Sequence, residues 1–170
     1  QAGRERPRRC LAGAEPRKEG ERGCGDSDQG STVSDPRRCG RMSTWDDVRR
    51  IALSLPETSE QTSRDLPAWR VREKTFVWER PLRKTDLRAL GDAAPEGPIL
   101  GAWVEHLVAK EAMLADAGGN FFTTPHFDGY AIVLVRLAEI SVADLEEVVV
   151  EAWLARAPKR LAKEYAEGNL

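Results

Sequence analysis

The sequence lacks the features that disulfide-stabilised, metal-binding and membrane-spanning proteins require. Residues 42–170 contain no cysteine, so their fold depends on no disulfide bond or thiolate metal site. Cys10, Cys24 and Cys39 are 14 and 15 residues apart without a C-x-x-C pair, a spacing typical of neither zinc nor disulfide frameworks. No stretch approaches the roughly 20 apolar residues of a membrane span, and no apolar run typical of a secretory signal occurs near the first residue. We therefore expect a cytoplasmic protein with no membrane association.

Motifs of the common enzyme classes are also absent. The chain has no G-x-G-x-x-G, Walker loop, G-x-S-x-G or H-E-x-x-H sequence. His106 and His126 are its two histidines, and neither has a cysteine or a set of further ligands nearby in the sequence. The sequence therefore predicts no metal site, no cofactor and no catalytic residue, and we expect a protein that is not an enzyme.

The composition changes at Met42. Residues 1–41 carry ten Lys/Arg and seven Asp/Glu, whereas residues 42–170 carry sixteen and twenty-one and contain every Trp, Phe and Tyr. The apolar residues of the first segment are scattered and too few to offset the entropy of ordering it. We predict that residues 1–41 are a disordered extension, or are translated from upstream of a native start at Met42. A basic tail that contacts nucleic acid is the alternative. Residues 42–170 are long enough for one domain.

Three segments have the apolar spacing of helices. The first spans 45–55, begins with a capping box of Thr44 and Asp47 and ends at Pro56. The second spans 107–117 and stops at a Gly-Gly pair. The third carries an apolar stripe over 142–153. Pro158 ends this last helix, and we expect a polar tail after it.

Short β-type segments separate these helices. Residues 57–64 predict a weak edge strand or loop, and 68–72 with 75–78 predict a hairpin that turns at Glu73-Lys74. Its apolar and basic residues alternate, which is typical of a strand with one solvated face. Further strands are expected at 99–104 and on either side of the corner within 121–137. Residues 80–98 predict an irregular connection with a helical turn.

The expected order is therefore α-β3(4)-α-β2-α. Short strands in meanders with few helices favour an α+β fold, in which an antiparallel sheet has helices packed on one face.

Basic residues gather in the middle of the chain. Residues 64–88 hold eight Lys/Arg and four acids, whereas residues 89–170 have a net charge of −7. Arginines interleaved with Trp69, Phe76 and Trp78 on strands suit contacts with phosphates and bases. A solvated strand face above core aromatics gives the same pattern without nucleic acid. The candidate DNA contacts are Arg70, Arg72, Lys74, Arg80, Arg83 and Lys84, with Lys159 and Arg160 from a second basic group after the last helix.

A proline-histidine corner precedes the longest strand. His126 and Asp128 have the residue types of an acid–base pair, but Asp128-Gly129 is explained by turn geometry alone. We keep His126 as a further candidate DNA contact on the same surface. A small enzyme that uses His126 and Asp128 is the least favoured hypothesis.

Several segments resemble the MmcQ/YjbR family. They are FFTTPHFDGY followed by AIVLVRL, the helix EVVVEAWLARAPKRL, and the hairpin AWRVREKTFVWER. The resemblance spans about 45–161. It departs from the family at Glu73-Lys74, where many members carry a glycine, and over 82–98.

The resemblance implies an α-β3-α-β2-α fold similar to type III secretion chaperones and described as a double wing. It also implies a non-catalytic, regulatory DNA-binding role. Because that fold is shared with chaperones, a protein or peptide partner on the sheet face is the alternative.

Overall fold

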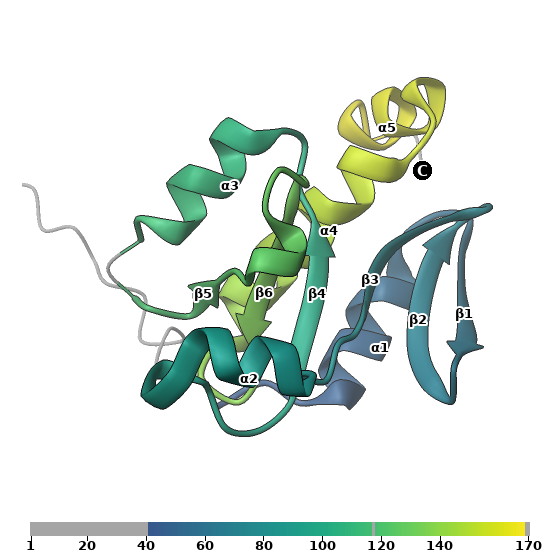
Figure 1. Cartoon of the computed structure of the whole chain (residues 1–170). Coiled ribbons are helices and arrows are strands. Elements are labelled where there is room, and N and C mark those ends of the chain that lie inside the picture. Colours follow the sequence, from purple (N-terminus) through teal and green to yellow (C-terminus); the bar gives the residue numbers. More distant parts are fainter. Residues whose placement is uncertain (1–40, 117, 169–170) are drawn as a thin grey trace, which may run out of the picture. The chain divides into compact units, whose positions relative to one another are not determined.

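The computed structural model describes residues 41–116 and 118–168 (Figure 1). The predicted extension therefore lies outside the described residues except for Arg41, and so do the three cysteines. The elements in chain order are α1 (Trp45–Ser54), β1 (Thr58–Ser63), β2 (Leu66–Val71), β3 (Lys74–Glu79), α2 (Lys84–Leu90), the 3₁₀ turn η2 (Gly91–Ala93), β4 (Ile99–Trp103), α3 (Leu107–Leu114), β5 (Phe121–Phe122), the 3₁₀ turn η3 (Pro125–Phe127), β6 (Ile132–Arg136), α4 (Val142–Arg156) and α5 (Lys159–Ala166).

Six strands form one sheet in the order β1-β2-β3-β4-β6-β5, and every neighbouring pair is antiparallel. The predicted α+β fold and antiparallel sheet are confirmed. Residues 57–64 do contain an edge strand, β1, whose side chains are mostly exposed. The hairpin turn is Arg72-Glu73, one residue earlier than predicted, because Val71 pairs with Lys74.

The element order differs from the expectation in two places. Helix α2 lies between β3 and β4, where a single helical turn was expected. Helix α5 follows Pro158, where a polar tail was predicted. Leu161 and Tyr165, four residues apart, give α5 an apolar side: Leu161 is buried, and the Tyr165 ring centroid lies 5.0 Å from that of Trp153. Two apolar residues among many charges were too weak a periodic signal to reveal this helix.

The main core lies between the sheet and the helices α1 and α4. Its buried members include Ile51 and Val149 from the helices and Val77, Leu100 and Val135 from the strands. The predicted Thr44–Asp47 capping box holds the start of α1, with the Thr44 amide donating to Asp47 Oδ2 at 3.0 Å. At the start of α4, the Ser141 hydroxyl accepts a hydrogen bond from the Asp144 amide at 3.2 Å.

A second, smaller core covers the opposite face of the sheet. Figure 1 shows α2 in front of the sheet, with α1 and α4 behind it. Leu90 of α2 and Phe127 of η3 pack with Ile99, Ile132 and Leu134. The sequence predicted helices on one face of the sheet only. The structure instead has α2 on the face opposite α1 and α4. Among the described residues, no helix combines the length and apolar character that crossing a membrane requires.

Candidate functional site

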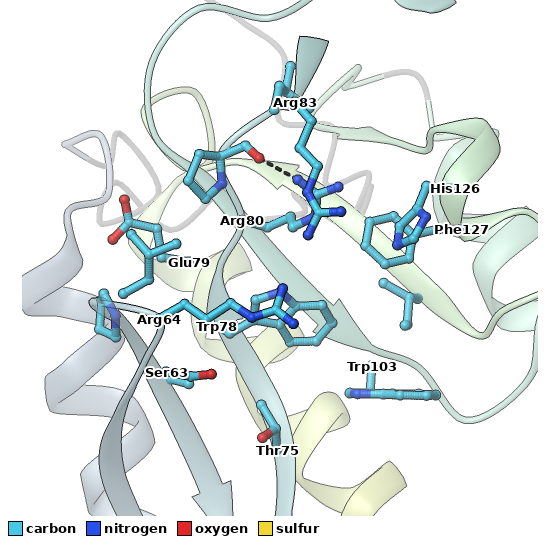
Figure 2. Close-up of a pocket in the computed structure, with 16 residues that line it drawn as sticks. Ser63, Arg64, Thr75, Trp78, Glu79, Arg80, Arg83, Trp103, His126 and Phe127 are labelled. Atoms are coloured by element: carbon cyan, nitrogen blue, oxygen red, sulfur yellow. Dashed lines mark hydrogen bonds between the residues drawn. The ribbon is translucent and has the colours of Figure 1, made fainter. Parts of the chain in front are cut away.

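A pocket of about 590 Å³ opens on the sheet face opposite α1 and α4 (Figure 2). Its walls come from five places in the chain: the β1–β2 turn with the strand ends beside it, strand β3, the β3–α2 connection, the end of β4, and η3 with the start of β6. The side chains that line it include Ser63, Arg64, Thr75, Trp78, Glu79, Arg80, Arg83, Trp103, His126 and Phe127.

Half-buried aromatic rings form much of the pocket surface. A Cβ atom on Gly101 would lie 2.6 Å from Cε2 of Trp78, so only glycine lets the indole cover β4 at this point. The Phe127 ring meets Trp78 edge-on at a centroid distance of 6.4 Å. The Arg156 guanidinium lies 4.3 Å from the Trp103 ring centroid, within cation–π range. Contacts on several sides therefore fix these rings in place.

Arg80 is the buried cation of the pocket wall. Its Nη2 atom lies 2.9 Å from Asp86 Oδ2, and its guanidinium also donates to the Pro81 carbonyl and lies 5.3 Å from the Phe127 ring centroid. Burial opposes ionisation of Asp86, but bonds from the Arg83 amide and the Arg80 guanidinium outweigh it and lower the pKa of that carboxyl. The charge of Arg80 is therefore offset, and the pair joins the start of α2 to the sheet.

Arg64 and Arg83 carry the pocket charges that are not offset. Both side chains are exposed, and neither forms an ion pair with another described residue. Figure 2 shows the Arg64 side chain extending from the β1–β2 turn into the pocket, while Arg83 enters from another side. Arg64 has a φ of 54° and Asp65 a φ of 65°. A tight hairpin turn requires positive φ at both central residues, and an arginine adopts it at a cost that glycine avoids.

His126 lines the pocket and Asp128 does not. The His126 ring lies 4.9 Å from the Phe127 ring, and a charge on His126 helps to lower the pKa of Asp86. Asp128 is exposed at the end of η3. The two side chains do not converge on one cavity, so the geometry does not favour the acid–base hypothesis.

The corner that carries His126 is held from α3. Lys110 is buried, and its Nζ atom donates to the carbonyls of Phe127 at 2.7 Å and Tyr130 at 3.1 Å. Burial lowers the pKa of this amine, and the charge of Asp128 opposes the shift. Lys110 was not singled out from the sequence, because no local signal marks a lysine of the helix predicted over 107–117 as buried.

The candidate residues on the hairpin form a second basic surface. Arg72 binds both carboxylate oxygens of Glu57, and this bond lowers the pKa of Glu57. Arg70 is half-buried and donates to Gln61 Oε1 at 2.8 Å and to the Glu73 carbonyl. These two arginines are therefore already occupied by partners within the chain.

Helix α5 extends this second surface. The bond to Glu164 raises the pKa of Arg160, and the charge of Arg72 opposes that rise because the hairpin tip lies near the start of α5. Lys74 and Lys159 are exposed, and neither has an ion pair among the described residues. Lys84 is exposed at the start of α2, outside the pocket lining.

Three of the nine candidate contacts thus meet at the pocket: Arg80, Arg83 and His126. Of the two interpretations of the interleaved aromatics, the structure favours core packing for Trp69 and Phe76, because both side chains are buried in the main core. Sequence reasoning missed Arg64 and Trp103 as pocket residues. The Arg64-Asp65 turn was a usable signal for Arg64, since it joins two paired strands. Within the described residues, no cluster of three or more His, Cys, Asp or Glu side chains is placed to hold a metal ion.

Comparisons with known proteins agree with the segments singled out above. A family model described as YjbR matches residues 53–155. The chain is 54% identical over 127 residues to "Uncharacterized protein Mb2600" of Mycobacterium bovis and to "Uncharacterized protein Rv2570" of Mycobacterium tuberculosis. Each match covers 73% of this chain and 96% of the relative. No solved structure matches the chain.

Proposed function

The chain belongs to the YjbR family, and from this we propose that it is a non-catalytic, regulatory DNA-binding module that meets DNA with its pocket face. One observation carries the proposal: two arginines without ion pairs, Arg64 and Arg83, stand beside exposed parts of the Trp78 and Trp103 rings. Arginine suits phosphate because its planar fork donates two parallel hydrogen bonds. Tryptophan suits unpaired bases because every base has a face that stacks.

The charge distribution restricts where DNA binds. Residues 42–170 carry five more acids than basic residues, so most of the surface repels phosphate. Contacts are therefore confined to the basic faces, and affinity falls steeply with salt as counterions are released. Lys74 and Lys159 supply further phosphate contacts outside the pocket, since neither is held by an ion pair.

A protein or peptide partner is the second candidate, and the half-buried Trp78 and Trp103 rings favour it as well. Aromatic rings also anchor protein interfaces. This candidate differs in its salt dependence, because apolar docking is not weakened by added salt in the way that phosphate binding is.

The test is fluorescence anisotropy with labelled single-stranded and duplex DNA at several salt concentrations. The variant is Arg64→Ala with Arg83→Ala. The control is Arg49→Ala with Arg50→Ala, which removes the same charge from α1, on the other side of the sheet. We expect the pocket variant to weaken binding and to lower the slope of log K against log salt by roughly 0.7–0.9 for each lost phosphate contact. Absence of binding by the unchanged protein at low salt, or equal effects of both variants, would contradict the proposal.

A further inference from the structure

The pocket combines a stacking surface and an anion site within one cavity. We propose that it binds a single nucleotide unit, with the base stacked on Trp78 and the phosphate held by Arg64 and Arg83. The ligand class is a planar heteroaromatic ring joined through a sugar to a phosphate, either free or as one unstacked residue of a single strand. The inference rests on the proposed function, because both assign DNA to this face. It requires in addition that Trp78 stacks on a base.

Neighbouring residues contact both rings of the base platform, Trp78 and Trp103. Trp78 is held from below by the close approach of Gly101 and from the side by Phe127. Trp103 is held by Arg156, whose Nε atom also donates to the Thr75 carbonyl at 3.3 Å. A fixed ring loses little freedom when a base stacks on it, so the stacking energy is retained as affinity. Each stacked base contributes roughly 1–3 kcal/mol when measured by alanine substitution.

The phosphate site consists of the pocket arginines that form no ion pair with a carboxylate of the described residues. Arg80 is neutralised by Asp86 at 2.9 Å, so it shapes the wall and leaves little net charge. Arg64 and Arg83 have no such partner, and Glu79 is the one carboxylate among the residues that line the pocket. The pocket therefore has a net positive charge, although the chain as a whole is acidic. Arg64 and Asp65 both have the positive φ that their two-residue turn requires, and this turn places the Arg64 side chain at the pocket.

The size and shape of the cavity suit one nucleotide. A volume of about 590 Å³ lies within the roughly 300–1,000 Å³ typical of small-ligand pockets. The hydroxyls of Ser63 and Thr75 also line it and provide neutral donors and acceptors for a sugar or a base edge. A base inside a duplex reaches such a pocket only after it leaves the stack, which costs a few kcal/mol. Single strands should therefore bind in preference to duplexes.

The experiment titrates the full chain with deoxyadenosine 5′-monophosphate, deoxyadenosine and inorganic phosphate by calorimetry. The nucleotide is expected to bind at one site per chain and about tenfold tighter than either fragment, because stacking and charge act together. Trp78→Leu should weaken the nucleotide by roughly tenfold or more. Arg64→Ala with Arg83→Ala should weaken the nucleotide and leave the nucleoside unchanged. The Arg49→Ala, Arg50→Ala control should match the unchanged protein.

A second arm separates the sources of the ligand and the two proposals. A 12-residue deoxyadenosine strand is compared with its duplex in the same variants. If duplex and single strand bind equally and Trp78→Leu changes neither, the nucleotide inference is overturned while DNA binding stands. If neither oligonucleotide binds but the free nucleotide does, with loss in both pocket variants, the inference stands and DNA binding is wrong. Because Arg64 is exposed on a turn, its variant tests the site even if Trp78→Leu fails to fold.

Discussion

The Trp78 indole covers Gly101 so closely that a methyl group at position 101 would lie 2.6 Å from the ring. Neither residue is near the other in sequence. They meet because β3 and β4 are neighbours and Trp78 pairs directly with Gly101. The absence of a side chain at position 101 therefore allows the Trp78 indole to pack directly against β4 in the pocket.

This contact predicts the effect of Gly101→Ala. The new methyl group must push the indole out of its position, and overpacking of this kind costs about 1–3 kcal/mol. We expect a lower urea midpoint and weaker nucleotide binding. In the Trp78→Leu background the same change should cost much less, because the ring that it strikes is gone. Additive losses in the double variant would show that the strain lies elsewhere.

The turn at Arg64 predicts opposite effects on stability and binding. Arg64→Gly removes the energetic penalty of an arginine with left-handed backbone angles, so the free energy of unfolding should rise by roughly 1 kcal/mol. DNA and nucleotide binding should weaken, because the arginine side chain is lost. Asp65→Gly is the matched control, since its φ of 65° is relieved in the same turn and its side chain lies outside the pocket lining. It should gain stability and keep its binding. Denaturant titration and calorimetry on both variants measure this difference, and equal binding losses would remove Arg64 from the site.

The Arg80–Asp86 pair predicts a stability change in acid. The folded-state pKa of Asp86 is lowered, so the pair stabilises the fold above the unfolded value, near 3.9, and this stability is lost as pH falls through the folded value. We expect the urea midpoint to fall below about pH 4. Asp86→Asn should be less stable at pH 7 and show a shallower fall in acid. An unchanged pH profile in Asp86→Asn would mean that other carboxyls cause the transition.

We predict that the buried amine of Lys110 stabilises the fold by holding the η3 corner. Lys110→Met keeps the length of the side chain but leaves the carbonyls of Phe127 and Tyr130 without their donor. Loss of such bonds costs about 1–3 kcal/mol, and the η3 corner that carries His126 should exchange its amide hydrogens faster. Lys84→Met is the control, because Lys84 is exposed and its loss should change stability by less than about 0.5 kcal/mol. Equal midpoints for the two variants would contradict the role.

Local patterns predicted most of the elements. Helical spacing predicted α1, α3 and α4, and alternation predicted the hairpin strands and β6. Both capping pairs were visible as short sequence signals, since a cap joins residues only three apart. Helix α5 was missed because its apolar contacts, Leu161 and Tyr165, are few and become clear only against the core that receives them.

The candidate site was predicted less well, because charge alone does not show which cations are free. Arg72 and Arg80 counted equally as candidates, yet both are held by carboxylates, Glu57 and Asp86. Glu57 is 15 residues away from Arg72 in sequence, so the pairing depends on how β1 lies against β2. Arg64 counted as one charge among eight, and its place in the pocket wall follows from the turn between those strands.

The sequence by itself determined the fold class, the family and the segment rich in basic residues, because these depend on local periodicity and on residue identity. The tertiary structure alone decided that Arg64, Trp78, Trp103 and His126 surround one pocket. These residues come from four separate parts of the chain. Their meeting depends on strand order and register, and in an antiparallel sheet a shift of one residue would turn each side chain to the opposite face.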